Sequence, residues 1–218
     1  MANSKINITM VQTNDLKFQY KKKETVFSFP NITLKPQENV LVLGKSGIGK
    51  TTFLHLLAGL LKPINGRVVV GSVDVSTLSN SKLDAFRGQN IGIVFQKKYA
   101  IPTLNVIENL KARIFFSKTP INNKAIDILL KELGMYQFKK NKINELSEGQ
   151  LQRLSIALAV VHKPKLILAD EPTSSLDDDN CKIVIELLLK QAKQTNANLI
   201  VITHDFRVKS YFKNSITL

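Results

Sequence analysis

The stretch Gly44-Lys45-Ser46-Gly47-Ile48-Gly49-Lys50-Thr51 decides the fold of this sequence of 218 residues, because it matches the pattern of a phosphate-binding P-loop. Before it lies Val40–Leu43, a short apolar run with the composition of a buried strand. After it, Thr51–Leu61 shows the apolar spacing of a helix. Strand, glycine-rich loop and helix in this order are the context that the motif requires. A glycine-rich turn without a ligand is the plain alternative, and the complete pattern disfavours it.

The residue types of this loop explain its chemistry. Glycines let several backbone N–H groups point into one anion-sized hollow, and the following helix adds the positive end of its dipole. Lys50 can reach the β- and γ-phosphates of ATP, and the Thr51 hydroxyl can ligate Mg²⁺. The predicted nucleotide-binding residues of the loop are Gly44, Lys45, Ser46, Gly47, Ile48, Gly49, Lys50, Thr51 and Thr52.

Two carboxylates follow another apolar run. Leu166–Ala169 reads as a buried strand and leads directly into Asp170 and Glu171. Ligand-binding acids belong at the carboxyl ends of parallel strands. Asp170 is therefore predicted to hold Mg²⁺, directly or through water, and Glu171 to polarise an attacking water as general base. The alternative is that both are surface acids without a ligand, and the P-loop earlier in the sequence disfavours it.

Two further predicted strands end in polar side chains. Leu199–Thr203 ends in His204, whose imidazole can donate a hydrogen bond to the γ-phosphate and position the water. Ile91–Phe95 ends in Gln96, an amide able to contact Mg²⁺ or the water. A histidine at a strand end is most often structural, but four strand ends here present polar groups to one edge. The predicted catalytic groups are Glu171, His204, Gln96 and Lys50, and the predicted metal ligands are Thr51, Gln96 and Asp170.

Short β-rich apolar runs alternate with helical patterns, which favours an α/β fold with a P-loop NTPase core and a mostly parallel sheet. Ile6–Tyr20, Thr25–Leu34 and Arg67–Val75 alternate like strands and predict an N-terminal antiparallel β layer.

From Gln96 to Leu146 the pattern is mostly helical, so we expect an inserted helical subdomain at about 97–146 within a single domain whose core is 1–96 and 147–218. Helices are expected at Leu104–Phe115, Asn123–Leu133 and Asp179–Thr195.

Three further stretches carry a resemblance to a known family. Leu146-Ser147-Glu148-Gly149-Gln150 is similar to the signature motif of ABC ATPases, which other P-loop proteins lack. Pro172-Thr173-Ser174-Ser175-Leu176-Asp177 looks like their D-loop. Tyr20 lies 30 residues before Lys50, where that family keeps an aromatic residue that stacks on adenine. In order and over nearly the whole chain, the sequence resembles the ABC ATPase family.

The resemblance implies an ATPase that works in pairs. Two cassettes of the family pack head to tail and hold two ATP molecules, each touching the P-loop of one subunit and the signature of the other. Ser147, Gly149 and Gln150 would then bind the nucleotide across the interface. A transmembrane permease is the other implied partner, contacted by the helical segment near Gln96–Leu133. The implied location is the cytoplasmic side of the inner membrane, as a peripheral subunit.

One residue departs from the family's commonest signature, which has glycine where this chain has Glu148. A carboxylate pointing at a triphosphate would be repulsive. We therefore expect Glu148 to point outward or to pair with a lysine.

The segment from Ile101 to Leu110 resembles ATPases of the lipoprotein-release and macrolide-export group. This resemblance predicts a motor for export or extraction of a lipid, lipoprotein or peptide. A soluble ABC ATPase of the iron–sulfur assembly type, without a membrane partner, stays open as the alternative. A module that binds ATP without hydrolysing it is disfavoured by the intact Lys50, Asp170, Glu171 and His204.

Composition excludes several other classes. The apolar share of 44% and charged share of 22% are ordinary for a globular protein, and the single cysteine excludes a disulfide framework. No apolar run reaches the ~18–20 residues that span a bilayer, and Met1–Met10 lacks the apolar core of a secretory signal. The net charge is +14, with lysine clusters at Lys21–Lys23 and Lys139–Lys142. We interpret these charges as a solvated surface in preference to a surface that binds anionic membrane headgroups. Only five of the 31 basic residues are arginine, so no nucleic-acid partner is expected.

Overall fold

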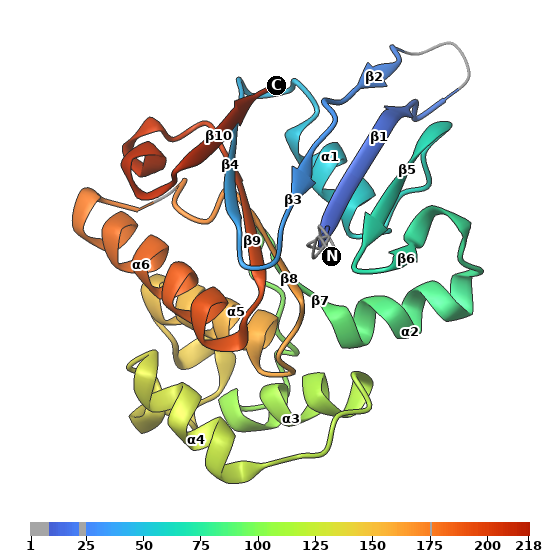
Figure 1. The fold of residues 1–218 in the computed structure, drawn as a ribbon. Coiled ribbons are helices and arrows are strands. Elements are labelled where there is room, and N and C mark those ends of the chain that lie inside the picture. Colours follow the sequence, from blue (N-terminus) through green and yellow to red (C-terminus); the bar gives the residue numbers. More distant parts are fainter. Residues whose placement is uncertain (1–8, 22–24, 175) are drawn as a thin grey trace, which may run out of the picture.

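A computed structural model describes residues 9–21, 25–174 and 176–218 of the chain. Among them, five strands form a parallel sheet in the order β10-β4-β9-β8-β7 (Figure 1). The four apolar runs predicted as strands lie in this sheet, and each observed strand differs from its prediction by one residue at one end. The strands are β4 (Asn39–Leu43), β7 (Ile91–Val94), β8 (Leu166–Asp170), β9 (Asn198–Thr203) and β10 (Asn214–Thr217).

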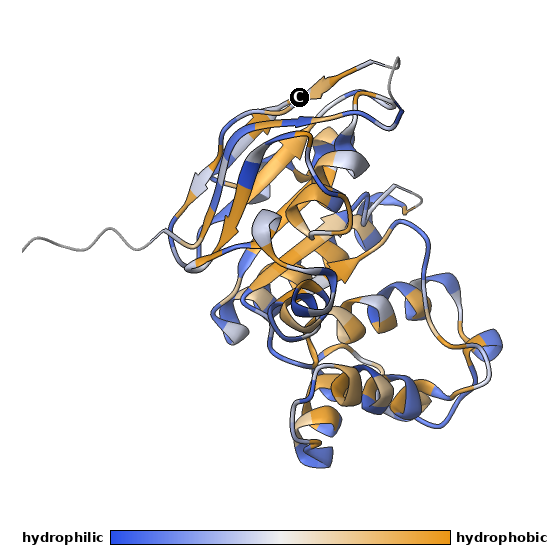
Figure 2. Cartoon of the chain, turned by 90° about the vertical axis from the view of Figure 1, so that its right-hand side faces the viewer, coloured by the Kyte–Doolittle hydropathy of each residue, from blue (hydrophilic) through white to orange (hydrophobic). Residues whose placement is uncertain are grey.

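Alternating side chains of these strands enter two separate hydrophobic clusters, because successive residues of a strand point to opposite faces. Val40 and Val42 face the cluster that includes helix α1 (Lys50–Leu57) and the second sheet. Leu41 and Leu43 face the helices on the other side. In Figure 2 the central strands are almost uniformly hydrophobic, whereas the surrounding helices mix hydrophobic and hydrophilic residues. Both faces of the parallel sheet are therefore covered.

The second sheet is antiparallel and has β1 (Val11–Phe18) at its centre, paired with two short strands and with β5 (Asn65–Val70). The stretch Thr25–Leu34 gives only β2 (Phe27–Ser28) and β3 (Thr33–Leu34), because Pro30 between them lacks a ladder donor. A turn at Gly71, with φ of 64°, separates β5 from β6 (Val73–Asp74). Residues 6–8 of the first predicted strand lie outside the described part.

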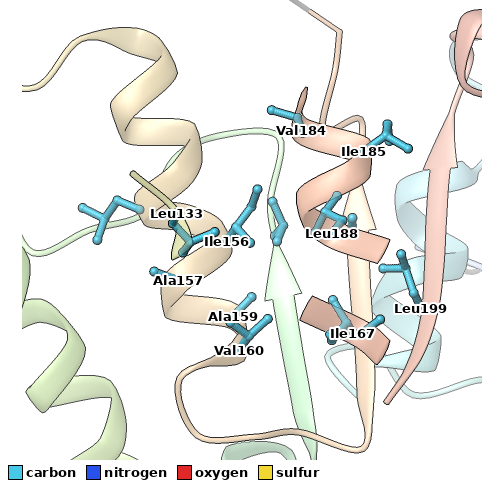
Figure 3. Close-up of a cluster of buried hydrophobic side chains, with 14 of the residues drawn as sticks. Leu133, Ile156, Ala157, Ala159, Val160, Ile167, Val184, Ile185, Leu188 and Leu199 are labelled. Atoms are coloured by element: carbon cyan, nitrogen blue, oxygen red, sulfur yellow. The ribbon is translucent and has the colours of Figure 1, made fainter. Parts of the chain in front are cut away.

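Helices α3 (Val106–Phe116) and α4 (Asn123–Glu132) form the predicted helical insertion. Helices α5 (Glu148–Val160) and α6 (Asp178–Thr195) cover the sheet face that Leu41 and Leu43 enter. Figure 3 shows Ile156 and Val160 of α5 and Val184 and Leu188 of α6 in one cluster with side chains of the sheet. The parallel core, antiparallel layer and inserted helices confirm the predicted fold class.

Two elements were not predicted, and one was predicted too long. Helix α2 (Asn80–Asn90) has no buried residue, so it carries no apolar periodicity in its sequence. Strand β10 lies at the sheet edge with mostly exposed side chains, and it likewise lacks an apolar run. Helix α1 ends at Leu57 rather than at Leu61, because Gly59 adopts a left-handed conformation with φ of 64°. Short 3-10 turns occupy Val75–Thr77, Tyr136–Phe138, Ile143–Glu145 and Phe206–Tyr211.

Part of the basic cluster Lys139–Lys142 is used inside the chain. Lys139 Nζ lies 3.3 Å from Asp127 Oδ1, and Lys142 Nζ donates to the Thr103 carbonyl at 2.8 Å. The other predicted cluster, Lys21–Lys23, lies largely outside the described residues. Among the residues that are described, no helix is long and apolar enough to cross a membrane.

Candidate nucleotide site

The carboxyl ends of four strands meet at one edge of the parallel sheet. The register pairs Leu43 with Thr203 and Asp170 with Ile202, while Val94 lies beside Ala169. The glycine-rich loop, His204 and Glu171 follow directly after three of these strands. Gln96 follows the fourth at a distance of two residues, because β7 ends at Val94 rather than at Phe95. Its side chain is exposed.

The glycine-rich loop is shaped by two left-handed glycines, Gly47 and Gly49, with φ of 80° and 103°. A Cβ on Gly49 would lie only 2.8 Å from a ring carbon of Phe27, so conformation and space both require glycine there. Gly49 is also the N-cap of α1, without a side-chain cap. The first N–H groups of this helix are consequently available to an anion.

Lys50 is folded back over the loop. Its ammonium donates to the carbonyls of Gly44 at 2.9 Å and Lys45 at 3.0 Å, and it lies 3.2 Å from Glu171 Oε1. The side chains of Lys50 and Glu171 are 7% and 8% exposed. The predicted cation and the predicted base are thus a buried ion pair.

Besides the Lys50 ammonium, three groups bind the Glu171 carboxylate. Thr203 Oγ1 donates to Oε2 at 2.7 Å, the His204 backbone N–H donates to the same oxygen at 3.3 Å, and His204 Nδ1 lies 2.9 Å from Oε1. The backbone of Glu171 is left-handed, with φ of 48°, which costs energy in a non-glycine residue. Burial alone would raise the pKa of this carboxyl, but the hydrogen bonds from His204, Thr203 and Lys50 outweigh it and lower the pKa. The residue therefore stays ionised, as a base must.

Sequence reasoning missed Thr203, although it stands immediately before the histidine at the end of a predicted strand. It also did not foresee that His204 would bind Glu171. An imidazole that donates from Nδ1 to Glu171 can donate from Nε2 to a phosphate only when doubly protonated.

Asp170 is more deeply buried than Glu171, and fewer hydrogen bonds to its carboxylate are found among the described residues. Burial raises the pKa of Asp170, and a hydrogen bond with Thr51 acts against this rise. Its Oδ1 atom is buried and has no hydrogen-bond partner among the residues that the structure describes. An unpaired carboxylate oxygen beside a threonine hydroxyl suits a hard cation, and Mg²⁺ needs only one or two such ligands besides water and substrate phosphates. No cluster of three or more His, Cys, Asp or Glu side chains suited to a metal occurs in the described residues.

Tyr20 stands at the rim of the site, 54% exposed, and its hydroxyl lies 2.8 Å from Thr52 Oγ1. The ring of Phe18 meets it edge-on, with centroids 4.8 Å apart. The Tyr20 ring is consequently fixed at two points while part of it remains open to a ligand. Phe18, the aromatic residue nearest to Tyr20 in the sequence, is buried in the core and leaves no ring face for adenine.

The signature residues form a separate feature. Ser147 caps α5 by accepting from the Gln150 N–H at 3.4 Å, and Gln150 Oε1 accepts from the Ser147 N–H at 2.8 Å. A Cβ on Gly149 would meet nothing within 4 Å. Glu148 forms an ion pair with Lys98, as expected of a carboxylate in this position. We call residues 147–150 the signature turn. In the described parts of the chain, no hydrogen bond or ion pair joins the signature turn to the glycine-rich loop.

Two side-chain hydrogen bonds, one buried and one partly buried, link α5 and the segments that follow β8 and β9. Gln152 Nε2 donates to the Pro172 carbonyl at 3.0 Å, and Thr173 Oγ1 donates to Asp205 Oδ2 at 2.9 Å. These contacts fix the start of the D-loop-like segment, of which Ser175 lies outside the described residues. Of the residues that make these side-chain contacts, Thr173 belongs to the stretch that resembles the D-loop, whereas the contacts of Gln152 and Asp205 were not predicted from the sequence.

Known proteins share this arrangement. The profile of the ABC transporter family matches residues 28–174. The lipoprotein-releasing system ATP-binding protein LolD of Hydrogenovibrio crunogenus is 37% identical over 204 residues, which cover 91% of this chain and 89% of LolD. LolD of Buchnera aphidicola subsp. Schizaphis graminum is 36% identical over 207 residues, or 92% and 90% of the two chains.

Solved structures agree with the sequence relatives. The dimeric post-hydrolysis state of the ATP-binding cassette MJ0796, bound to ADP and Pi, superposes with a TM-score of 0.84 at 32% identity. The match covers 96% of this chain and 94% of that one. On its motifs, its fold and these relatives, the chain belongs to the ABC transporter family and is one of its ATP-hydrolysing cassettes.

Proposed function

We propose that this cassette is the motor subunit of a transporter that exports or extracts lipid, lipoprotein or peptide cargo through a separate permease. The observation that carries the proposal is the division of the site. The glycine-rich loop and Glu171 form one internally bonded unit, whereas Ser147 and Gly149 lie at the start of α5 and, among the described residues, share no hydrogen bond with that unit. Head-to-tail pairing of two cassettes would complete both sites, and the similar cassette MJ0796 is dimeric.

The residues of one chain have distinct roles in this proposal. Lys50 releases its two loop carbonyls and binds the β- and γ-phosphates, while Tyr20 stacks on adenine. Glu171 accepts the proton of the attacking water, and His204 holds the carboxylate from Nδ1. The backbone N–H groups of residues 44–52, including those of Ser46 and Thr52, surround the phosphates.

Mg²⁺ would be held by Thr51 and Asp170, with Gln96 brought in from its exposed position. When bound, the cation offsets the charge of the phosphate oxygens. The protein's own contribution is to bury the Asp170 carboxyl and to place the Thr51 hydroxyl beside it.

A groove beside the nucleotide site suits a membrane partner. Its volume is about 640 Å³, and it lies between α2, β7, α3 and α5. Exposed apolar side chains gather there, with Tyr99 65% and Phe116 70% exposed. We name it the docking groove; its walls include Leu60, Phe95, Tyr99, Ile101, Phe116 and Leu158.

The floor of the docking groove is firmly held. Arg113 of α3 donates to the carbonyls of Gly88 at 3.1 Å and Ile91 at 3.2 Å. Its Nη2 also lies 2.9 Å from His162 Nε2. Burial, followed by the charge of Arg113, lowers the pKa of His162 to about 3, so the imidazole is neutral and accepts. A rigid apolar groove next to Gln96 is where a cytoplasmic helix of a permease could sense the nucleotide site.

The cargo class and location rest on the relatives. Both LolD proteins are named as ATP-binding parts of a lipoprotein-releasing system. We therefore place the chain at the cytoplasmic face of the inner membrane, bound through its permease. Within one cassette, residues 1–96 and 147–218 would form the core and about 97–146 the subdomain that carries the α3 wall of the groove.

The test pairs two neighbouring phenylalanines. A candidate permease is coexpressed with this chain, and complex formation and ATP hydrolysis are measured in detergent. Phe116→Asp should lose the complex, because it places a charge in the docking groove. Phe115→Asp is the matched control, since Phe115 is equally exposed at 70% but does not line the groove.

Retention of the complex by Phe116→Asp contradicts the docking groove as the permease site. A fully active chain that binds no permease in either form favours the soluble iron–sulfur assembly type instead.

A further inference from the structure

The ion pair between Lys98 and Glu148 joins two segments that are 50 positions apart. Lys98 lies in the segment after β7, two residues beyond Gln96. Glu148 is the first residue of α5 and stands between Ser147 and Gly149. The pair therefore connects the segment that walls the docking groove with the signature turn.

Ordinary surface ion pairs contribute little, but this one is asymmetric. The Lys98 side chain is only 13% exposed, whereas that of Glu148 is 65% exposed. Among the contacts of the described residues, Glu148 is the acceptor for the Lys98 ammonium. Because the Lys98 ammonium is largely covered, burial lowers its pKa. A covered ammonium that reaches out to a carboxylate restricts where that carboxylate can point.

Glu148 also occupies a sensitive position. Under the proposed function, Ser147 and Gly149 meet the γ-phosphate of the partner's nucleotide. A free carboxylate between them would repel that phosphate, and a water-poor interface strengthens the repulsion.

We propose that Lys98 is a positioning residue that neutralises Glu148 and holds it aside, so that the signature turn can accept a nucleotide from a second cassette. This inference rests on the proposed function, because it assumes the head-to-tail pair. Lys98 is required only because Glu148 is present, and that conditional requirement makes the inference testable.

The experiment measures dimerisation by light scattering with MgATP in a Glu171→Gln background, which blocks hydrolysis. Lys98→Met removes the charge but keeps the length of the side chain. It should weaken the dimer by about tenfold or more, since an unpaired carboxylate then faces the phosphate. Glu148→Gly alone should change little, and the double variant Lys98→Met with Glu148→Gly should restore the dimer.

Two controls separate this role from a structural one. Lys97→Met removes an adjacent exposed lysine that forms no ion pair with any other described residue, and it should leave dimerisation unchanged. Nucleotide binding by the separate monomers, followed by calorimetry, should be equal in all variants. A lysine needed for folding, or one that touches the phosphate itself, would not be rescued by Glu148→Gly.

The outcomes are distinct. If the Glu171→Gln chain dimerises and Lys98→Met dimerises equally well, the inference is wrong and the proposed function stands. If Lys98→Met weakens the dimer but the double variant stays weak, the inference is again wrong. If the Glu171→Gln chain itself never dimerises, with or without its permease, the proposed function and this inference fall together.

Discussion

Two regions differ in how many of their contacts lie within one chain. One is the sheet edge that carries the glycine-rich loop, Glu171 and His204, here called the phosphate-loop edge. The other is the signature turn, residues 147–150. At the first, Lys50 and Glu171 form a buried ion pair, and the exposed His204, which follows the neighbouring strand, binds the same carboxylate. At the second, Ser147 and Gln150 cap each other, and within the described part of the chain their side chains form no hydrogen bond beyond their own helix start. The first region is organised before a ligand arrives. The second is shaped by its own helix start, and under the proposed pairing a second chain would bring the nucleotide to it.

The difference has an energetic side. Removing one partner of a buried ion pair leaves an uncompensated charge, which costs about 3–5 kcal/mol. Replacing an exposed capping residue costs only about 1 kcal/mol. Substitutions at the loop edge should therefore disturb the single chain, whereas substitutions at the signature should disturb mainly the pair.

The largest effect is expected from Lys50→Ala, which should abolish nucleotide binding. The phosphates lose the cation that the motif places among them, and Glu171 loses its buried counter-ion. Calorimetry with MgATP is the measurement. Lys45→Ala serves as the control and should bind within a few-fold, because the exposed Lys45 side chain leaves its backbone carbonyl and N–H in place. Unchanged affinity in Lys50→Ala would defeat the P-loop assignment.

The second effect separates the two regions. In a Glu171→Gln background, Ser147→Arg should abolish ATP-driven dimerisation, since it adds bulk and charge to the interface. ATP binding by the monomer should survive, because no contact joins Ser147 to the glycine-rich loop in the described residues. Light scattering and calorimetry on the same sample measure both properties. Equal dimerisation of the double variant would rule out the head-to-tail arrangement.

A smaller effect is expected at the rim. Tyr20→Ala should weaken ATP binding about tenfold, the loss that goes with one base–aromatic stack of ~1–3 kcal/mol. Tyr20→Phe keeps the ring and loses only the contact with Thr52, so it should bind nearly as well as the parent chain. If Tyr20→Ala binds ATP normally, the adenine contact must be sought elsewhere, and Phe18 is too buried to supply it.

The smallest effect concerns stability. The folded chain raises the pKa of Asp170, so folding favours its protonated form and the ionised form lowers stability at neutral pH. Asp170→Asn should therefore raise the melting temperature of the nucleotide-free chain, by about 2–4 °C for each kcal/mol gained. The same variant should lose Mg²⁺-dependent hydrolysis. A lower melting temperature would mean that the ionised carboxylate has a partner that stabilises it.

Much of this protein could be predicted from short stretches of sequence. The glycine-rich loop is a local structure, because its glycines and the helix after it are contiguous in the chain. The buried strands β4, β8 and β9 were predicted because both faces are covered and their apolar runs are unbroken. Asp170 and Glu171 could be assigned as candidates because their place at a strand end follows from the run before them.

Other features depended on contacts between distant residues, which no local pattern records. Helix α2 and strand β10 are polar elements placed by the sheet they adjoin. The sequence predicted that Glu148 would point away or find a lysine, but only the fold selected Lys98 from many candidates. Likewise, the bond from His204 to Glu171 exists because β8 and β9 are neighbours in register. Side-chain chemistry and spacing determine which groups are available, whereas strand order and packing decide which of them meet.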